Sequence, residues 1–336
     1  MITTARQIRY TGVIAVVTLA VFVASCTGSD TSQAPAEGQA PATQAPAINP
    51  LLAGAIDFHT HTLPDMQPRS MDAIELAKVA RARGMRGLVL KNHFISTAGF
   101  AHIVRTEVPG IEVFGGIDLN LPVGGINIHA VEHMLKMTGG WGRVVWFPTS
   151  NSEYGARGRD GGPPKPPYVS VARNGQLLPE VKQVIGIIAK NNLVLETGHS
   201  SPEESLMLVK EGKAQGVQNM LVTHAAGSMS VEQMQEATKS GAYIEWIYGN
   251  ILTTEAIGRK ARWSDPDYAA MIRKVGVEWS VLATDLGQFG NVLPVDGMEA
   301  FIERMSKAGF TKQELDRMAK DNPAKLLGLS PYTTSQ

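Results

Sequence analysis

The stretch Ala55-Ile56-Asp57-Phe58-His59-Thr60-His61 joins a short apolar run to two histidines. Such a run predicts a buried β-strand, which we place at Ala55–His59. Side chains alternate along a strand, so His59 and His61 point to the same side and could share one metal ion. A lone His-x-His pattern is weak evidence, and the rest of the chain decides what it means.

Seven similar runs follow, separated by stretches with apolar residues at three- and four-residue spacing. The eight predicted strands are Ala55–His59, Gly87–Lys91, Ile111–Ile117, Arg143–Pro148, Leu193–Thr197, Met220–His224, Ala242–Trp246 and Trp279–Thr284. Predicted helices include Met71–Arg83, Val181–Lys190, Pro202–Glu211 and Val231–Ser240, with terminal helices over Phe301–Met305 and Lys312–Leu329. This alternation predicts parallel βαβ units, and eight of them indicate an α/β protein with a single (β/α)8 TIM barrel. A doubly wound open sheet is the rival, but no Gly-x-Gly-x-x-Gly motif follows the first strand.

The length and composition permit one large α/β domain or two small ones. The chain has 336 residues, of which 43% are hydrophobic and 18% charged. Its 31 basic and 31 acidic residues cancel, so no net charge favours nucleic acid or an acidic membrane surface. We expect a small-molecule substrate and no nucleic-acid partner, with homo-oligomer formation left open. Cys26 is the only cysteine, which excludes a cysteine-based zinc site.

The first fifty residues predict a targeting signal and a membrane anchor with a linker. Arg6 and Arg9 precede an apolar run over Val13–Val23, which is too short to span a bilayer and is typical of a signal peptide. Its end, Val23-Ala24-Ser25-Cys26, resembles the lipobox of bacterial lipoproteins, where the signal is removed before a lipid-bearing cysteine. The alternative is an ordinary secretory signal with an incidental cysteine.

Three segments follow from this pattern. Residues 1–26 are expected to be a lipoprotein signal peptide, 27–50 a disordered linker rich in Ala, Pro, Gln, Ser and Thr, and 51–336 the barrel domain. The expected location is the bacterial cell envelope, in the outer membrane or periplasm of a Gram-negative cell, or outside the cell. The only expected membrane contact is the lipid on Cys26.

Metal-ligand side chains recur where the predicted strands end, which is where barrel enzymes place their active sites. The strand ends concerned are Lys91-Asn92-His93, Glu196-Thr197-Gly198-His199, Thr223-His224 and Thr284-Asp285. One buried histidine or aspartate could be purely structural, but five strands sharing the pattern indicate a site. His93 could bind substrate, bind metal or line the mouth. The remaining histidines, His102, His129 and His133, fall in helical stretches and are expected on the surface or in packing.

This order of histidines and aspartate resembles the amidohydrolase superfamily of metal-dependent hydrolases, which includes the phosphotriesterases. The C-terminal stretch Asn322-Pro323-Ala324-Lys325-Leu326-Leu327-Gly328-Leu329 resembles a common ending of that superfamily. The resemblance covers about residues 55–329, and residues 84–93 and 283–288 look like a poorly characterised bacterial branch. It implies that His59, His61 and Asp285 bind a buried metal ion, that His199 and His224 bind a second one, and that Asp285 is the general base.

The chain departs from the superfamily pattern at the residue that would bridge two metal ions. Many members of the superfamily use a carbamylated lysine at the end of strand four, where this chain has Phe147-Pro148-Thr149. Lys91 could bridge in its place if carbamylated, or could bind an anionic substrate as a free amine. Without a bridge, a one-metal site of His59, His61, His199 and Asp285 remains, and His224 polarises the substrate. One or two zinc ions are expected, with manganese or iron as substitutes.

These residues predict a metal-dependent hydrolase in which an activated water attacks a small-molecule amide, ester, lactone or phosphoester. The alternatives are a metal-dependent decarboxylase of the same superfamily and a catalytically inactive, lipid-tethered binding protein. Loops set specificity in this fold, and Tyr154–Pro167 is expected to cover the barrel mouth. The predicted substrate-binding residues are His93, Arg69, Trp146 and Glu245, with Tyr154, Arg157 and Gln288 as further lining.

Overall fold

The computed structural model describes residues 48–158 and 161–332. All of them belong to one compact unit, residues 44–336. The predicted signal peptide, Cys26 and nearly all of the predicted linker lie outside the described residues. Within the described part of the chain, no helix combines the length and the apolar character that a membrane span requires.

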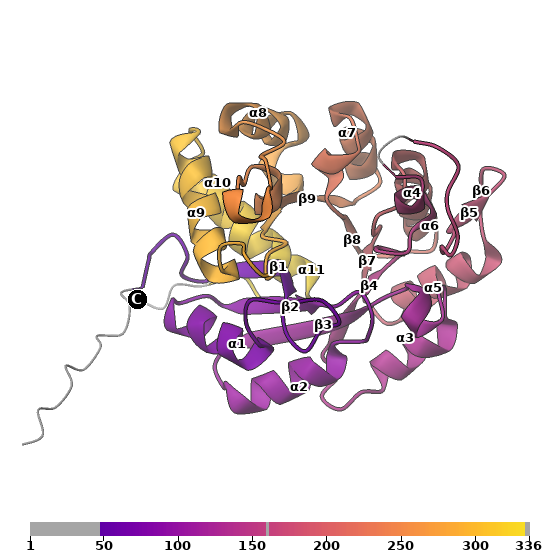
Figure 1. Cartoon of the computed structure of the whole chain (residues 1–336), viewed down its shortest axis with the longest axis horizontal. Helices are drawn as coiled ribbons and strands as arrows, with labels where there is room; N and C mark the ends of the chain where they lie inside the picture. Colours follow the sequence, from indigo (N-terminus) through magenta and orange to yellow (C-terminus); the bar gives the residue numbers. More distant parts are fainter. Residues whose placement is uncertain (1–47, 159–160, 333–336) are drawn as a thin grey trace, which may run out of the picture. The chain divides into compact units, whose positions relative to one another are not determined.

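Eight parallel strands form a (β/α)8 barrel, with helices around the outside (Figure 1). The strand order is β1 (Ile56–His61), β2 (Gly87–Lys91), β3 (Glu112–Asp118), β4 (Gly142–Trp146), β7 (Val194–Glu196), β8 (Asn219–Val222), β9 (Tyr243–Ile247) and β10 (Ser280–Ala283). All eight strands were predicted to within a few residues. The TIM-barrel prediction is confirmed, and the open-sheet alternative is wrong.

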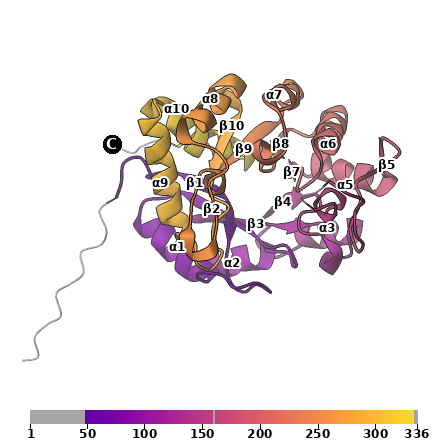
Figure 2. The same ribbon diagram turned by 45° about the horizontal axis from the view of Figure 1, so that its top comes forward.

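The outer helices connect successive strands and can be followed in both views (Figure 2). They are α1 (Ala73–Ala82), α2 (Ala98–Glu107), α3 (Ile128–Leu135), α5 (Pro179–Lys190), α6 (Pro202–Ala214), α7 (Val231–Lys239), α8 (Asp265–Val275) and α9 (Pro294–Lys307). Side-chain caps fix several of their starts. At α6, Ser201 accepts a hydrogen bond from the Glu204 amide while the Glu204 carboxylate accepts one from the Ser201 amide.

The barrel closes where β10 meets β1, and the closing bonds involve predicted site residues. The Asp285 amide donates to the His59 carbonyl at 2.9 Å, and the His61 amide donates to the Leu286 carbonyl at 2.8 Å. The buried Asp57 carboxylate accepts from the Thr284 amide at 2.9 Å and from its hydroxyl at 2.6 Å. Barrel closure and the position of Asp285 therefore depend on the same contacts.

The core has an inner and an outer layer, as alternation along parallel strands requires. The inner layer fills the barrel with Ile56, Phe58, Val89, Phe114, Val144, Trp146, Val194, Leu221, Tyr243, Ile247, Val281 and Ala283. The outer layer packs the opposite strand faces against the helices. A strand side chain that follows the inner set toward the carboxyl end therefore points into the barrel mouth.

Two segments differ from expectation. The predicted helix Lys312–Leu329 is divided into α10 (Lys312–Asp316), a π-helical turn η6 (Arg317–Asp321) and α11 (Asn322–Leu326). The stretch Tyr154–Pro167, expected to be loop, begins within the short helix α4 (Glu153–Ala156), and a small hairpin of β5 (Ala172–Arg173) and β6 (Gln176–Leu177) follows it.

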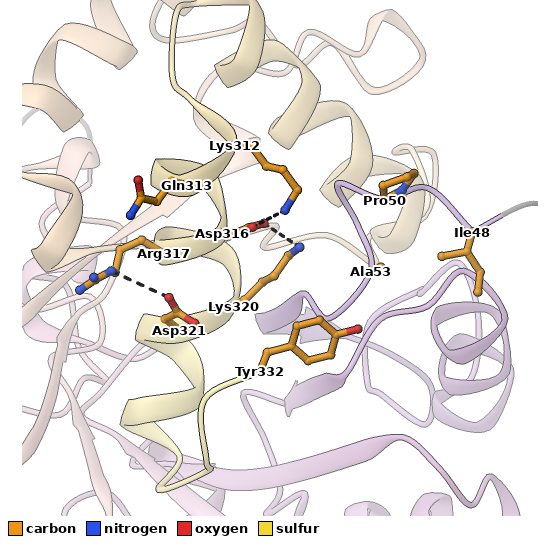
Figure 3. Close-up of a pocket in the computed structure, with 10 residues that line it drawn as sticks. All are labelled: Ile48, Pro50, Ala53, Lys312, Gln313, Asp316, Arg317, Lys320, Asp321 and Tyr332. Carbon is orange, nitrogen blue, oxygen red and sulfur yellow. Dashed lines mark hydrogen bonds and ion pairs between the residues drawn. The ribbon is translucent and has the colours of Figure 1, made fainter. Parts of the chain in front are cut away.

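The π-helical turn borders a pocket of about 770 Å³ beside the residues that precede β1, at the amino end of the barrel (Figure 3). Its charged side chains pair with one another. The buried Lys320 amine lies 2.6 Å from Asp316, which also pairs with Lys312. Amino ends of barrel strands serve stability, so we place the functional site at the other end.

Candidate metal centre

Five imidazoles form a ring at the carboxyl end of the barrel. Neighbouring ring centroids are 5.2 Å apart for His59 and His61, 5.0 Å for His61 and His93, and 6.1 Å for His93 and His199. His199 and His224 are 5.1 Å apart, and His224 closes the ring at 4.9 Å from His59. The histidines predicted from four strand ends are thus brought together. His102 and His133 lie in helices α2 and α3, as expected.

A β-bulge turns the first two histidines inward. Ile56 and Phe58 belong to the inner core, so strict alternation would turn His59 toward the outer helices. Between Asp57 and Thr60, however, the pairing of β1 with β2 slips by one residue. The extra residue changes the phase of the strand, so that both His59 and His61 reach the site.

Asp285 faces three of these imidazoles. Its Oδ1 lies 3.2 Å from Nε2 of both His59 and His61, and its Oδ2 lies 3.6 Å from Nε2 of His224. Burial alone would raise the pKa of Asp285, but the facing imidazoles hold that pKa well below its usual range. Asp285 is therefore an ionised carboxylate among nitrogen ligands.

The backbone is strained at two of these residues. His224 has φ +48° and Asp285 has φ +53°, and the other non-glycine residues with positive φ in the described chain are two asparagines. Asparagine, aspartate and histidine adopt this left-handed conformation more often than other side-chain-bearing residues, but it still costs free energy, and such strain clusters at functional sites. The strain points each side chain into the ring.

A glycine positions His199. Gly198 has φ +64°, and a Cβ at this position would lie 2.0 Å from the Phe147 carbonyl oxygen. Only glycine fits both the conformation and the close approach. The His199 amide can then donate to the Pro148 carbonyl at 2.9 Å, which attaches the turn after β7 to the end of β4.

A buried layer of large polar side chains lies beneath the ring, on the inward-facing positions of their strands. Its members are Lys91, Trp146, Glu196 and Glu245, each at most 1% exposed. The Lys91 amine lies 5.2 Å from the Trp146 ring centre. Burial raises the pKa of Glu196, and burial together with the nearby Glu196 raises that of Glu245, while Lys91 opposes both shifts. The predicted bridging role of Lys91 stays a prediction.

Two residues predicted to bind substrate lie in this layer instead. Trp146 is fully buried and packs in the inner core. Glu245 is also fully buried, and its Oε1 lies 3.0 Å from His59 Nδ1 while its Oε2 accepts from the His224 amide at 3.0 Å. Glu245 therefore orients two of the imidazoles. Sequence alone could not show this, because an inward-facing strand position does not reveal its depth in the barrel.

The other predicted lining residues fall in different places. Arg69 is 6% exposed, pairs with Asp65 at 2.7 Å and lies near enough to His61 to influence its pKa. Gln288 donates to the Asp285 carbonyl at 2.8 Å. Tyr154 and Arg157 border a separate polar pocket of about 500 Å³ at the start of α6. Arg69 is thus a cation near the ring, as the buried Lys91 is.

The donor set fits a divalent cation. Burial holds the pKa of His59 and His199 well below its usual value, and lowers that of His61 and His224 to about 4, so all four rings are neutral near pH 7. Within the described residues, four buried ring nitrogens lack a hydrogen-bond partner: His59 Nε2, His61 Nδ1, His199 Nε2 and His224 Nε2. Buried polar atoms without partners are costly, and a metal ion would satisfy such nitrogens. Ligand atoms of His59, His61 and Asp285 lie within 4.8 Å of one another.

Some site residues were not found from the sequence. Asp57 holds the His59 amide at 3.2 Å as well as Thr284. Asp118, Asn120 and Thr149 surround His93 at the ends of β3 and β4. Their position after two predicted strands was the available signal, but no metal-ligand pattern marked them.

The chain resembles several solved barrels in overall fold. An organophosphorus hydrolase from Deinococcus radiodurans superposes with a TM-score of 0.55 at 13% identity, over 82% of this chain and 92% of that one. A dihydroorotase gives 0.54 at 16% identity, over 84% and 70%. An enzyme engineered for organophosphate hydrolysis from a weak promiscuous lactonase gives 0.53 at 15% identity, over 84% and 98%. At such low identity these similarities establish the fold.

Sequence comparison gives a family without a known activity. No curated protein matches the chain. A family of unknown function, DUF6282, matches residues 54–245, which include β1 to β8, the start of β9 and the five imidazoles of the ring. The match covers more than half of the chain, so the protein belongs to the DUF6282 family.

Proposed function

We propose that this protein is a metal-dependent hydrolase of the amidohydrolase type. The observation that carries the proposal is the ring of five imidazoles beside Asp285, in which four buried nitrogens have no hydrogen-bond partner within the described residues. The structural neighbours named as an organophosphorus hydrolase and a dihydroorotase support hydrolysis as the reaction class. Zinc suits neutral imidazoles and one carboxylate, and manganese or iron(II) are the substitutes.

His59, His61 and Asp285 would hold one ion, and His199 and His224 are the further ligands. A divalent ion bound at this position would lower the pKa of water toward about 7 and polarise the bond under attack. The protein's own part is to orient the ligands. Glu245 bonds to Nδ1 of His59, which leaves Nε2 facing Asp285.

Asp285 is the proposed general base. Its low pKa keeps it ionised near neutral pH, and its carboxylate faces ring nitrogens of His59, His61 and His224. It would accept a proton from the attacking water and return it to the leaving group. Arg69, beside His61, is suited to bind an anionic group of the substrate.

The substrates we propose are small-molecule amides, esters, lactones or phosphoesters. The test combines metal analysis of the purified full-length protein with a panel of these four bond types. Stoichiometric metal and turnover that chelation abolishes support the proposal. Tight binding without turnover would favour the inactive binding protein, and release of carbon dioxide from a carboxylate substrate would favour the decarboxylase.

We also propose that residues 1–26 are a lipoprotein signal peptide and that Cys26 anchors the mature chain to the cell envelope, with residues 27–50 as the linker. The sequence before the barrel supports this, because its single cysteine follows an apolar run of signal-peptide length.

A further inference from the structure

We propose that His93 is a metal ligand and helps to bind a second ion beside the one held by His59, His61 and Asp285. The proposal rests on the metal-dependent function above and adds a ligand from the end of β2. Its basis is the set of side chains that contact His93 from the end of β3 and from the residues that follow β3 and β4.

Three buried polar residues contact the ring or the backbone of His93. Asp118 and Thr149 are each 1% exposed and Asn120 is fully buried. His93 Nδ1 lies 3.2 Å from Asp118 Oδ2 and 2.9 Å from Thr149 Oγ1. Asn120 Nδ2 donates to the His93 carbonyl at 2.9 Å, so the same cluster fixes both the ring and the backbone of this residue.

The hydrogen bonds of this cluster fix the tautomer of His93. The Thr149 hydroxyl donates to Asp118 Oδ2 at 2.8 Å and accepts from Asn120 Nδ2 at 2.7 Å. The Asn120 oxygen accepts from the Thr149 and Asn151 amides, so the amide orientation is determined. Both groups that face His93 Nδ1 are therefore acceptors, and Nδ1 must carry the proton. Nε2 is left with a free lone pair.

The same arrangement occurs at His59. There the buried Glu245 carboxylate lies 3.0 Å from Nδ1 and leaves Nε2 for the ring centre. A carboxylate on the outer nitrogen is the usual support of a metal-binding histidine, because it fixes the tautomer and strengthens the ligand. Two histidines of the ring, His59 and His93, have this support, from Glu245 and Asp118 respectively. His93 therefore has a buried carboxylate at Nδ1, as His59 does.

The ring offers more ligands than one zinc ion uses. Zinc usually takes four ligands, whereas the ring supplies five imidazoles and Asp285 supplies a carboxylate. The surplus leaves ligands for a second ion. His93 stands between His61, at 5.0 Å, and His199, at 6.1 Å, on the side of the ring away from His59.

The burial of Asp118 also supports a ligand role for His93. Keeping the Asp118 carboxylate 1% exposed costs free energy that its contacts must offset, and its Oδ1 has no partner among the described residues. The His93 side chain itself is 14% exposed and opens toward the ring. A residue that only lined the mouth would not need so large a buried support.

Metal binding by variants of the full-length protein tests the inference. The probes are zinc, counted per chain after dialysis, and cobalt(II), titrated into metal-free protein and followed by its absorption spectrum. We expect two ions per chain in the natural protein and one in His93→Gln. The matched control is His129→Gln, since the His129 side chain is 83% exposed on α3, and it should keep both ions.

Two variants test the support while leaving His93 in place, and they serve if His93→Gln fails to fold. Thr149→Val and Asp118→Asn should weaken binding of the second ion by about 10- to 100-fold without changing the first. Unfolding temperatures measured on the metal-free proteins show whether each variant is folded.

The outcomes separate the two proposals. Two ions in His93→Gln with natural affinity, and a change confined to the substrate KM, would overturn the ligand role and favour substrate binding. Natural protein that holds one ion, kept in His93→Gln, would also overturn it while leaving the hydrolase proposal intact. Natural protein that binds no ion would contradict the proposed function itself and the inference with it.

Discussion

Asp285 combines a strained backbone with a carboxylate surrounded by ring nitrogens. Its φ is +53°, and its Oδ1 lies 3.2 Å from two imidazole nitrogens. Such strain persists when surrounding contacts enforce it, and here Asp57 holds the preceding Thr284 while Gln288 holds the Asp285 carbonyl. These contacts position the carboxylate before any substrate binds.

The role of Asp285 as a base predicts the effect of Asp285→Asn. Removing a general base lowers turnover by about 10²- to 10⁴-fold, while an isosteric amide leaves the packing unchanged. We expect kcat to fall by that factor and the unfolding temperature to change little, as measured on a substrate from the panel. Turnover within a few-fold of the natural protein would remove Asp285 from this role.

The buried histidines predict a loss of stability in acid for the metal-free protein. Burial lowers the pKa of His61 and His224 to about 4 from the ordinary 6.5. Above pH 6.5 both rings are neutral in the folded and unfolded chain. As pH falls from 6.5 to 4, only the unfolded chain gains protons, so the free energy of unfolding falls, by on the order of 3 kcal/mol for each histidine.

Urea unfolding of chelator-treated protein at pH 7.5 and pH 4.5 measures this loss. His61→Gln removes one titrating group and should show a smaller difference between the two pH values than His129→Gln, whose missing histidine is exposed. Equal losses in the two variants would mean that His61 is not buried in its neutral form.

At the scale of elements, the turn between β7 and α6 depends on Gly198. In Gly198→Ala the new Cβ would lie 2.0 Å from the Phe147 carbonyl in addition to occupying a left-handed position. We expect the free energy of unfolding to fall by more than about 2 kcal/mol and metal affinity to fall, since His199 follows directly.

Gly216→Ala is the matched control for that turn. Gly216 has φ +83° but nothing within 4 Å of the added Cβ, so it carries the conformational cost of about 1–2 kcal/mol alone. Chemical denaturation of both variants measures the difference. Similar costs in the two variants would show that the close approach at Gly198 does not matter.

The elements themselves were predictable, while the phase of β1 was not. Apolar runs and strand-end histidines located all eight strands, because each signal lies within a few consecutive residues. The bulge between Asp57 and Thr60 has no such local signal and depends on pairing with β2. The same holds for the division of the last helix by a π-helical turn, where Lys320 pairs with Asp316.

In the molecule as a whole, the candidate metal ligands were predictable from the sequence. The residues that hydrogen-bond to those ligands and orient them were not. His59, His61, His199, His224 and Asp285 are residue types that bind metal and stand at strand ends. Glu245 and Asp118 act through histidines 186 and 25 residues away in the sequence, so only the closed barrel shows them as partners. The depth of Trp146, which was predicted to bind substrate and lies in the inner core, is likewise a property of all eight strands.

If Cys26 carries the lipid anchor, it determines where the protein is located without affecting the metal content or activity of the barrel. Cys26→Ser should abolish incorporation of labelled fatty acid and move the protein from the membrane fraction to the soluble fraction. Metal content and activity should stay unchanged, because the barrel residues are untouched. Unaltered labelling and fractionation of the variant would exclude Cys26 as the anchor.

We propose that histidines from separate strands share a cation with Asp285. Anomalous X-ray diffraction at the zinc absorption edge, from crystals of the zinc-loaded protein, locates such an ion. We expect a strong anomalous peak about 2.0–2.2 Å from ring nitrogens of His59 and His61 and from an Asp285 oxygen. Zinc-loaded crystals with no peak in this ring, or with peaks confined to other parts of the molecule, would contradict it.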